Sequence, residues 1–92
     1  TEFALEQNYP NPFNPTTTIS YSLGTTEHVT LEVYDLLGHK IATLVSGVRP
    51  AGEHHVQWNG TDDAGSAVAS GVYFYRLTSQ SRVETRKMML LQ

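Results

Sequence analysis

Apolar and polar residues alternate along most of this chain, and the alternation predicts strands. The clearest run covers residues 17–23, where every second position is apolar: Ile19, Tyr21 and Leu23. Residues 28–35 repeat the pattern, with one apolar face formed by Val29, Leu31 and Val33. A period of two residues is typical of a strand that buries one face and exposes the other.

The third expected strand, residues 39–46, departs from this alternation. Its apolar residues Ile41 and Leu44 lie three positions apart. A β-bulge would bring both side chains to one face, and a short helical turn is the alternative. The turn that precedes this strand, residues 35–38, ends on Gly38, where a positive φ is expected.

Three more strands are expected in the second half of the chain. After a turn at residues 50–52, residues 53–59 place His54, Val56 and Trp58 on one face. Residues 72–79 are rich in β-formers, and their expected inward face consists of Tyr73, Tyr75 and Leu77. The last strand, residues 83–91, ends in apolar residues on both faces. Six or seven strands without a convincing helix predict an all-β, antiparallel β-sandwich.

A proline- and asparagine-rich lead-in, residues 1–16, precedes the sandwich expected over residues 17–92. Residues that precede proline avoid the helical conformation, so this segment is expected to be extended or turning. A free linker would not need apolar anchors, yet the lead-in carries four: Phe3, Leu5, Tyr9 and Phe13. We therefore expect the lead-in to pack against the sandwich.

Composition narrows the range of functions. A length of 92 residues is expected to form one domain with a modest core. The net charge of −3, with only six lysines and arginines, argues against sequence-independent binding of nucleic acid. No cysteine is present, which excludes disulfides and thiolate metal sites. No apolar run approaches the roughly 20 residues of a membrane-spanning helix, and an export signal would be expected upstream on a longer precursor.

Catalysis and metal binding find little support. The chain lacks a cysteine nucleophile, a Gly-x-Ser-x-Gly elbow and a phosphate-binding glycine loop, so no enzyme activity and no cofactor are expected. His54 and His55 are adjacent on a strand and leave it on opposite faces; for His54, a core-edge position hydrogen-bonded to backbone is favoured. Asn59, Asp62 and Asp63 offer oxygen ligands for calcium, but plain turn chemistry is favoured there.

Sugar binding is the remaining option for a small ligand. Exposed aromatic rings can stack on sugars, and the candidates are Tyr34, Trp58 and Phe74. Trp58 falls on the inward face of its strand by alternation. A large aromatic residue there is favoured as a core residue of the sandwich over a ligand platform.

The order of several motifs along nearly the whole chain resembles that of the type A C-terminal sorting domain of type IX secretion cargo. The most specific is the lead-in run Asn8-Tyr9-Pro10-Asn11-Pro12-Phe13-Asn14-Pro15. Later matches are residues 19–23, 33–38, 51–54, 58–60, 70–77 and 87–88. The second half also resembles the immunoglobulin-like domain of flagellar hook-capping proteins. That family lacks the proline-rich opening and ranks second.

This resemblance implies an immunoglobulin-like sandwich that acts as a non-catalytic sorting module for a larger cargo. The implied partners are the outer-membrane translocon, surface sortase components and upstream cargo domains of the same precursor, and the implied destination is the cell surface or the medium. No cofactor is implied. The matching motif residues are Pro10, Asn11, Pro12, Phe13, Gly71, Tyr73, Lys87, Met88, Met89, Leu90 and Leu91.

Two points about these motif residues stay open. Gly71 is expected to permit either a conformation or a close approach that a Cβ would block. The last strand either is read by edge pairing with a receptor or simply completes the core. The chain also ends on Leu91-Gln92, whereas many members of the family end on basic residues. The alternative functions are a structural or spacer module and a carbohydrate-binding module attached to a secreted enzyme.

Overall fold

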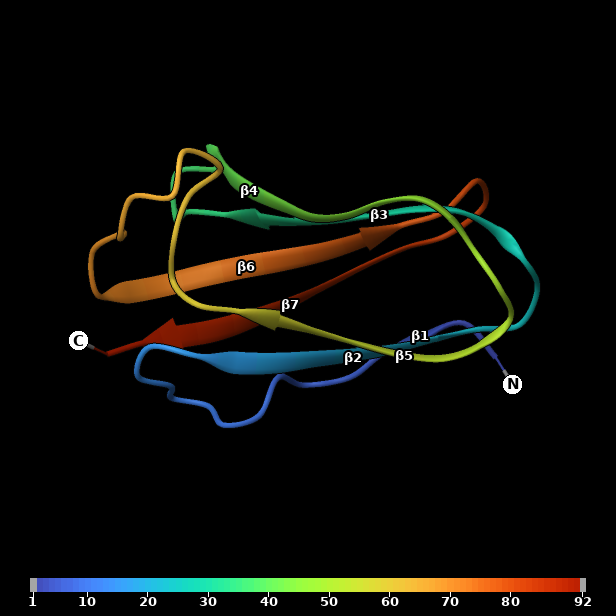
Figure 1. Ribbon diagram of the computed structural model, residues 1–92, viewed down its shortest axis with the longest axis horizontal. Helices are drawn as coiled ribbons and strands as arrows, with labels where there is room; N and C mark the ends of the chain where they lie inside the picture. The colour runs from blue at the N-terminus through green and yellow to red at the C-terminus, as the bar shows by residue number, and fades with distance from the viewer. Residues whose placement is uncertain (1, 92) are drawn as a thin grey trace.

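Seven strands form two antiparallel sheets that pack face to face, as the computed structural model of residues 2–91 shows (Figure 1). One sheet has the strand order β1 (Ala4–Leu5), β2 (Thr17–Leu23) and β5 (Gly52–Trp58). The other has the order β4 (Lys40–Arg49), β3 (Glu27–Tyr34), β6 (Gly71–Thr78) and β7 (Val83–Leu90). The prediction of an all-β sandwich with about seven strands is confirmed. Within residues 2–91, no helix is long and apolar enough to cross a membrane.

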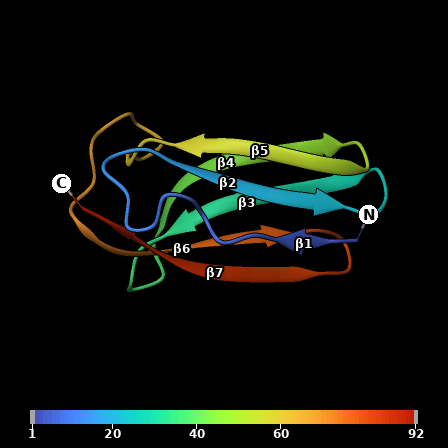
Figure 2. The same ribbon diagram turned by 90° about the horizontal axis from the view of Figure 1, so that it is seen from below.

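The two sheets close the sandwich differently at its two sides. Figure 2 shows β1 of one sheet lying beside β7 of the other, whereas β5 and β4 form the two sheet edges at the opposite side. The segment between β1 and β2, residues 6–16, runs along the molecule to the end where β7 finishes (Figure 1). The lead-in and the last strand are therefore neighbours in space.

The core lies between the sheets and consists of the alternating residues that the sequence indicates. In β3 these are Val29, Leu31 and Val33, which are fully buried. In β6 they are Tyr73, Tyr75 and Leu77, and the register pairs Leu31 with Leu77 and Val33 with Tyr75. Trp58, at the end of β5, is 2% exposed. Burial of one face in each strand holds the register, because a slip of one residue would turn the apolar face outward.

Strand β4 contains two bulges, where the sequence suggested one. The pairing of β4 with β3 skips Leu44 and then Ile41, which are the two residues that break the alternation. The extra residues re-aim the strand, so that Ala42 and Val45 are buried while Ile41 and Leu44 pack only partly against the core. The bulge expected from the spacing of Ile41 and Leu44 is therefore confirmed, and each of the two residues sits at a bulge of its own. The strand also continues to Arg49, beyond its expected end.

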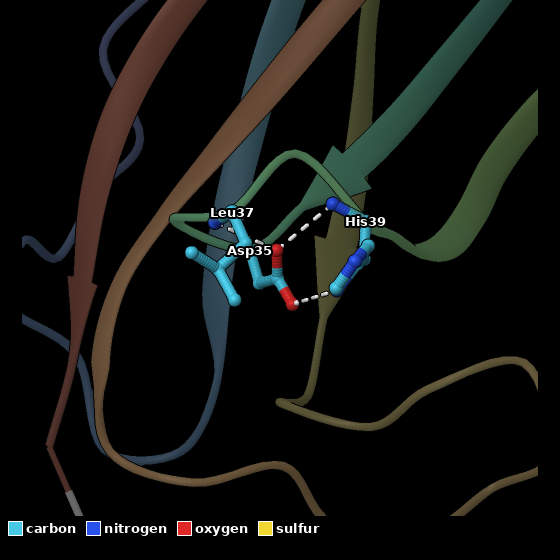
Figure 3. A network of polar contacts seen from close by, with 3 residues as sticks. All are labelled: Asp35, Leu37 and His39. Atoms are coloured by element: carbon cyan, nitrogen blue, oxygen red, sulfur yellow. Dashed lines mark hydrogen bonds and ion pairs between the residues drawn. The ribbon is translucent and has the colours of Figure 1, made fainter.

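A side-chain cap holds the turn between β3 and β4 (Figure 3). Oδ1 of Asp35 accepts hydrogen bonds from the backbone N–H groups of Leu37 and His39, both at 2.9 Å. The second oxygen, Oδ2, lies 3.3 Å from Nδ1 of His39. The hydrogen bond from the His39 backbone is the main cause of a lowered pKa for Asp35. Gly38 closes the turn with φ of 87°, the positive value expected there.

Candidate functional site

The lead-in covers the outer edge of β7 near the end of that strand. The N–H of Phe13 donates to the carbonyl of Met89 at 3.0 Å, and the Phe13 carbonyl accepts from the N–H of Leu91 at 2.9 Å. Just before these contacts along β7, Oδ1 of Asn11 accepts a hydrogen bond from the N–H of Met89 at 3.0 Å. Edge pairing with a receptor, one of the two alternatives for this strand, would therefore require a receptor to displace the chain's own lead-in here.

Side chains of β7 hold the earlier part of the lead-in. The N–H of Leu5 in β1 donates to Oε1 of Glu84 at 3.1 Å, and its carbonyl accepts from Nε of Arg86 at 2.6 Å. Further along, Nε2 of Gln7 donates to the carbonyl of Lys87 at 2.8 Å. A carboxylate and a guanidinium thus take the place of a neighbouring strand at the outer edge of β1.

A buried hydrogen-bond network anchors the middle of the lead-in to the core. The hydroxyl of Tyr75 donates to the carbonyl of Glu6 at 2.7 Å and accepts from the N–H of Asn8 at 2.8 Å. The side-chain amide of Asn8 donates to Oγ1 of Thr17 at 2.9 Å and to the carbonyl of Pro10 at 3.2 Å. Burial raises the pKa of Tyr75 to about 12, although the hydrogen bond from Asn8 acts in the opposite direction. The hydroxyl therefore stays protonated at neutral pH and can hold both backbone groups.

Three aromatic rings from separate parts of the chain pack together in the core beside the lead-in. The ring of Trp58 lies 5.7 Å from that of Phe13 and 5.5 Å from that of Tyr73, between ring centroids. The Tyr73 hydroxyl donates to the carbonyl of Ala69 at 2.6 Å, which ties the start of β6 to the loop before it. Phe13 and Tyr73 are therefore core residues, and their place in the motif is explained by packing.

The remaining motif residues divide by exposure. Met88 and Leu90 are buried, as completion of the core requires. Met89 is 40% exposed and Leu91 47% exposed. The other exposed members are Pro10, Asn11, Pro12 and Lys87. Of the two alternatives considered for the end of β7, completion of the core is the one that the burial of Met88 and Leu90 shows, while Met89 and Leu91 present apolar side chains to the outside.

A hollow of about 250 Å³ lies where the lead-in meets β6 and β7. Its lining residues are Asn11, Pro12, Val72, Lys87, Met88 and Met89. Five of these six are motif residues, and they come from the two ends of the sequence. Val72 is the member that sequence reasoning missed as a site residue; its signal was its position between Gly71 and Tyr73. An apolar lining with an ammonium group suits an apolar side chain of a protein partner next to a negative charge.

Gly71 is required for its backbone conformation. Its φ is 150°, a value that residues with a Cβ rarely adopt, and no atom lies within 4 Å of the place that a Cβ would occupy. Of the two reasons expected for this glycine, the conformation is therefore the one that applies. The residue pairs with Leu90, so its backbone sets the start of β6 against the end of β7.

Comparison with known families identifies the fold. The family model of the FlgD Ig-like domain matches residues 13–82. The chain belongs to this family. The immunoglobulin-like prediction is thereby confirmed, and of the two resemblances seen in the sequence, the one to hook-capping proteins, ranked second, is the one shown. The matched residues leave out most of the lead-in and all of β7.

Solved structures share the fold of this FlgD Ig-like domain over almost its full length. Dimeric latent PorU from Porphyromonas gingivalis is 21% identical with a TM-score of 0.77, over 99% of this chain and 10% of that one. PorZ, a surface component of the type IX secretion system of the same organism, is 22% identical with a TM-score of 0.60, over 98% and 11%.

FlgD from Xanthomonas campestris, a protein of flagellar hook capping, is 21% identical with a TM-score of 0.65, over 95% of this chain and 65% of that one. The present chain spans about a tenth of PorU and of PorZ. No curated protein matches it. At this level of sequence identity, the similarity to these structures shows a shared fold and no more.

The histidines of this FlgD Ig-like domain lie as the strand pattern predicts. Nε2 of His54 lies 2.8 Å from the carbonyl of Pro50, and its ring stacks on Tyr21 at 5.1 Å. His55 leaves the opposite face, where Nδ1 lies 2.8 Å from Oγ of Ser20. The core-edge interpretation of His54 is confirmed. Across residues 2–91, no three histidine, aspartate or glutamate side chains are grouped to hold a metal ion.

The loop after β5 uses its acidic side chains to bond local backbone. Oδ1 of Asp62 accepts from the N–H groups of Ala64 and Ser66, at 3.0 and 2.9 Å. Oδ1 of Asp63 accepts from the N–H of Thr43 at 3.0 Å. These bonds are the turn chemistry favoured for this loop, and the last of them also fixes the loop to the edge of β4.

The aromatic candidates for sugar binding are not arranged as a stacking platform. Trp58 is in the core, as predicted. The guanidinium of Arg76 lies over the ring of Tyr34, 4.6 Å from its centroid, and the Tyr34 hydroxyl donates to Glu32 at 2.7 Å. One face of the Tyr34 ring is therefore covered by a cation, and Phe74 beside it is only half-exposed.

Proposed function

We propose that this FlgD Ig-like domain is a non-catalytic sorting module, which directs a larger cargo protein across the outer membrane by type IX secretion and to the cell surface. The observation that carries the proposal is the joining of the lead-in to the end of β7. Asn11 and Phe13 bond directly to Met89 and Leu91, and the motif residues of both segments line one hollow. The likeness to PorU and PorZ in fold supports the same system.

The joined surface suits recognition of a folded domain. In an unfolded chain, Pro12 and Met89 would be separated by most of the sequence, and they line the same hollow only after folding. A receptor that reads this hollow would therefore bind the module after it has folded in the periplasm. The proposed receptor is the outer-membrane translocon. Surface sortase components act after it, and the cargo domains precede the module in the same precursor.

A reporter fusion tests this proposal. Residues 1–92 are fused to the C-terminus of a reporter that carries its own periplasmic signal, in a host with type IX secretion and in the same host without the translocon. Reporter at the surface or in the medium of the first strain alone is the expected result. Reporter that stays in the periplasm of both strains, with the module folded and intact, would contradict the proposal.

A pair of charge reversals separates recognition from general effects of charge. Lys87→Glu changes the wall of the hollow, whereas Arg82→Glu makes the same charge change at the other end of β7, where the guanidinium lies near Phe3. Both side chains are exposed, so both variants should fold. We expect export of the reporter to fall for Lys87→Glu only. Equal export of the reporter by the two variants would show that the translocon does not recognise the hollow.

A further inference from the structure

Three of the four sheet edges in this sandwich are protected. At the outer edge of β1, Glu84 and Arg86 bond the backbone of Leu5. The lead-in covers β7. At β4, the two bulges interrupt the edge, and the loop residue Asp63 bonds Thr43 through its side chain and Ile41 through its backbone N–H. Exposed edges are templates for pairing with another chain, and natural sheets usually block them in such ways.

The fourth edge, that of β5, has no such protection. On the lead-in side of β2, Thr18 exchanges backbone hydrogen bonds with Tyr9, and the carbonyl of Ser20 accepts from Glu6. Because backbone groups alternate in direction along a strand, the residues between them bond β5. The register pairs those residues with His54, Val56 and Trp58.

The intervening residues of β5 therefore point their backbone groups away from the molecule. These are Glu53, His55 and Gln57, and their side chains are exposed on the outer face of the sheet. In the described chain, none of the three forms a hydrogen bond through its backbone outside the ladder with β2. The strand is also regular: its pairing with β2 contains no bulge, and residues 52–58 contain no proline or lysine.

We propose that β5 pairs in antiparallel fashion with β5 of a second copy of this chain, about a two-fold axis at His55. The pairing joins the two three-stranded sheets into one continuous sheet of six strands. His55 faces His55 of the second copy, and Glu53 faces Gln57 of the second copy at both ends. The outward N–H and C=O groups of all three residues then find partners.

The side chains of β5 are complementary to themselves in this register. Glu53 lies opposite an amide, which can donate to its carboxylate, so no two like charges face each other while the imidazoles are neutral. On the inner face, Gly52 lies opposite Trp58 and His54 opposite Val56, so that a large residue meets a small one at the ends of the strand. A second copy of the chain provides this complementary strand itself, so the pairing needs no other protein.

The pairing involves one seven-residue strand from each chain, which is a small interface. Small interfaces belong to weak and transient complexes. The expected dimer therefore forms only at high local concentration, and solution tests need protein up to about 1 mM. The inference is independent of the sorting role, because the purified chain is sufficient to test it.

A cysteine pair tests the register directly, since the chain contains no cysteine. In the proposed dimer, residues opposite each other as a hydrogen-bonded pair have Cα atoms about 5.5 Å apart, within reach of a disulfide. His55→Cys should therefore form a disulfide-linked dimer under mild oxidation. Gln57→Cys is the matched control, because its two copies would be separated by about 13 Å along the strand. We expect His55→Cys to cross-link at least about tenfold faster, and equal rates would overturn the register.

Charge variants at Gln57 test the same register in the reduced, uncross-linked protein. Gln57→Lys places a cation opposite Glu53 of the second copy at both ends, and Gln57→Glu places a second carboxylate there. Sedimentation equilibrium should show that the first variant dimerises roughly 2- to 30-fold more tightly and the second more weakly by a similar factor. A chain that remains monomeric up to about 1 mM in all three forms, or that responds identically to both changes, would overturn the proposal.

Discussion

The side-chain oxygen of Asn11 accepts a hydrogen bond from the backbone N–H of Met89 at 3.0 Å, across 78 residues of sequence. Met89 uses its carbonyl for the N–H of Phe13 as well, so the lead-in satisfies both backbone groups on the outer side of this residue. The consequence is that the first and last segments of the chain form one structural unit. Changes in either segment should therefore affect the other.

Removing the Asn11 acceptor should loosen the end of β7 without unfolding the domain. Asn11→Ala leaves the N–H of Met89 to water, and we expect it to lower the free energy of unfolding by about 1 kcal/mol. The Met89 amide should exchange with solvent faster in this variant, as measured by hydrogen exchange. Asn14→Ala is the matched control, because Asn14 is exposed and forms no bond in the described chain. Equal exchange of Met89 in both variants would show that the contact does not hold the strand.

The lead-in contributes to the core through Phe13, which is 1% exposed and packs its ring at a tilt against that of Trp58. Phe13→Ala should lower the free energy of unfolding by about 3–5 kcal/mol, because it opens a cavity beside the indole. Chemical denaturation followed by Trp58 fluorescence measures the loss. Tyr9→Ala, in the same segment, removes a ring that is 81% exposed and should change stability little. A similar loss from the two variants would contradict the packing described for the lead-in.

Tyr75 should make the stability of the domain fall at high pH. Its pKa is raised to about 12, above the ordinary value of 10.0, because the hydroxyl is buried. The unfolded chain therefore loses this proton at lower pH than the folded chain. The contribution of Tyr75 is complete below pH 10 and is lost as the pH rises toward 12. Urea unfolding between pH 9 and pH 12 should show the decline.

Tyr75→Phe separates this effect from that of the other tyrosines. The variant leaves the N–H of Asn8 buried without its acceptor, so we expect it to cost about 1–3 kcal/mol at pH 7. Its stability should also decline less steeply between pH 10 and pH 12 than that of the wild type. An unchanged decline would mean that other groups cause it.

The pattern of strands could be predicted from the sequence where one face of a strand is buried. The alternation in β3 and β6 named the buried residues correctly, because each apolar side chain there has a partner across the sandwich. The alternation failed in β4. There, burial depends on where two extra residues, Ile41 and Leu44, are accommodated against β3, and this is a property of the pairing.

The candidate site was only partly predictable, for a related reason. Proline and asparagine in the lead-in indicated a non-helical segment, and Phe13 indicated packing. Neither showed that the segment would lie along β7, because the bonds that place it there come from Asn11 and from backbone groups. Backbone hydrogen bonds carry no sequence signal, so the covered edge of β7 and the hollow beside Pro12 became visible only in the fold.

Asp35 should contribute to stability above pH 4 through the turn before β4. Because its pKa is lowered from the model-compound value of 3.8, mainly by the hydrogen bond from the His39 backbone, the ionised form is favoured in the folded chain. This contribution is present above the unfolded pKa and is lost as the pH falls through the folded one. Asp35→Asn should therefore weaken the fall in stability between pH 5 and pH 2. NMR titration of the carboxyl group should give a pKa below 3.8, and a value above it would contradict the role of the cap.

The central claim is that the outer-membrane translocon recognises the surface formed by the lead-in and the end of β7. The most direct test compares Met89→Asp with Val83→Asp in the reporter fusion. Both residues are exposed on the same side of β7, at 40% and 59%, but only Met89 lines the hollow. Reporter at the cell surface is quantified against total reporter, after thermal unfolding has shown both modules to be folded. Surface export should fall severalfold for Met89→Asp and remain at the wild-type level for Val83→Asp; export that is unaffected by Met89→Asp would contradict the claim.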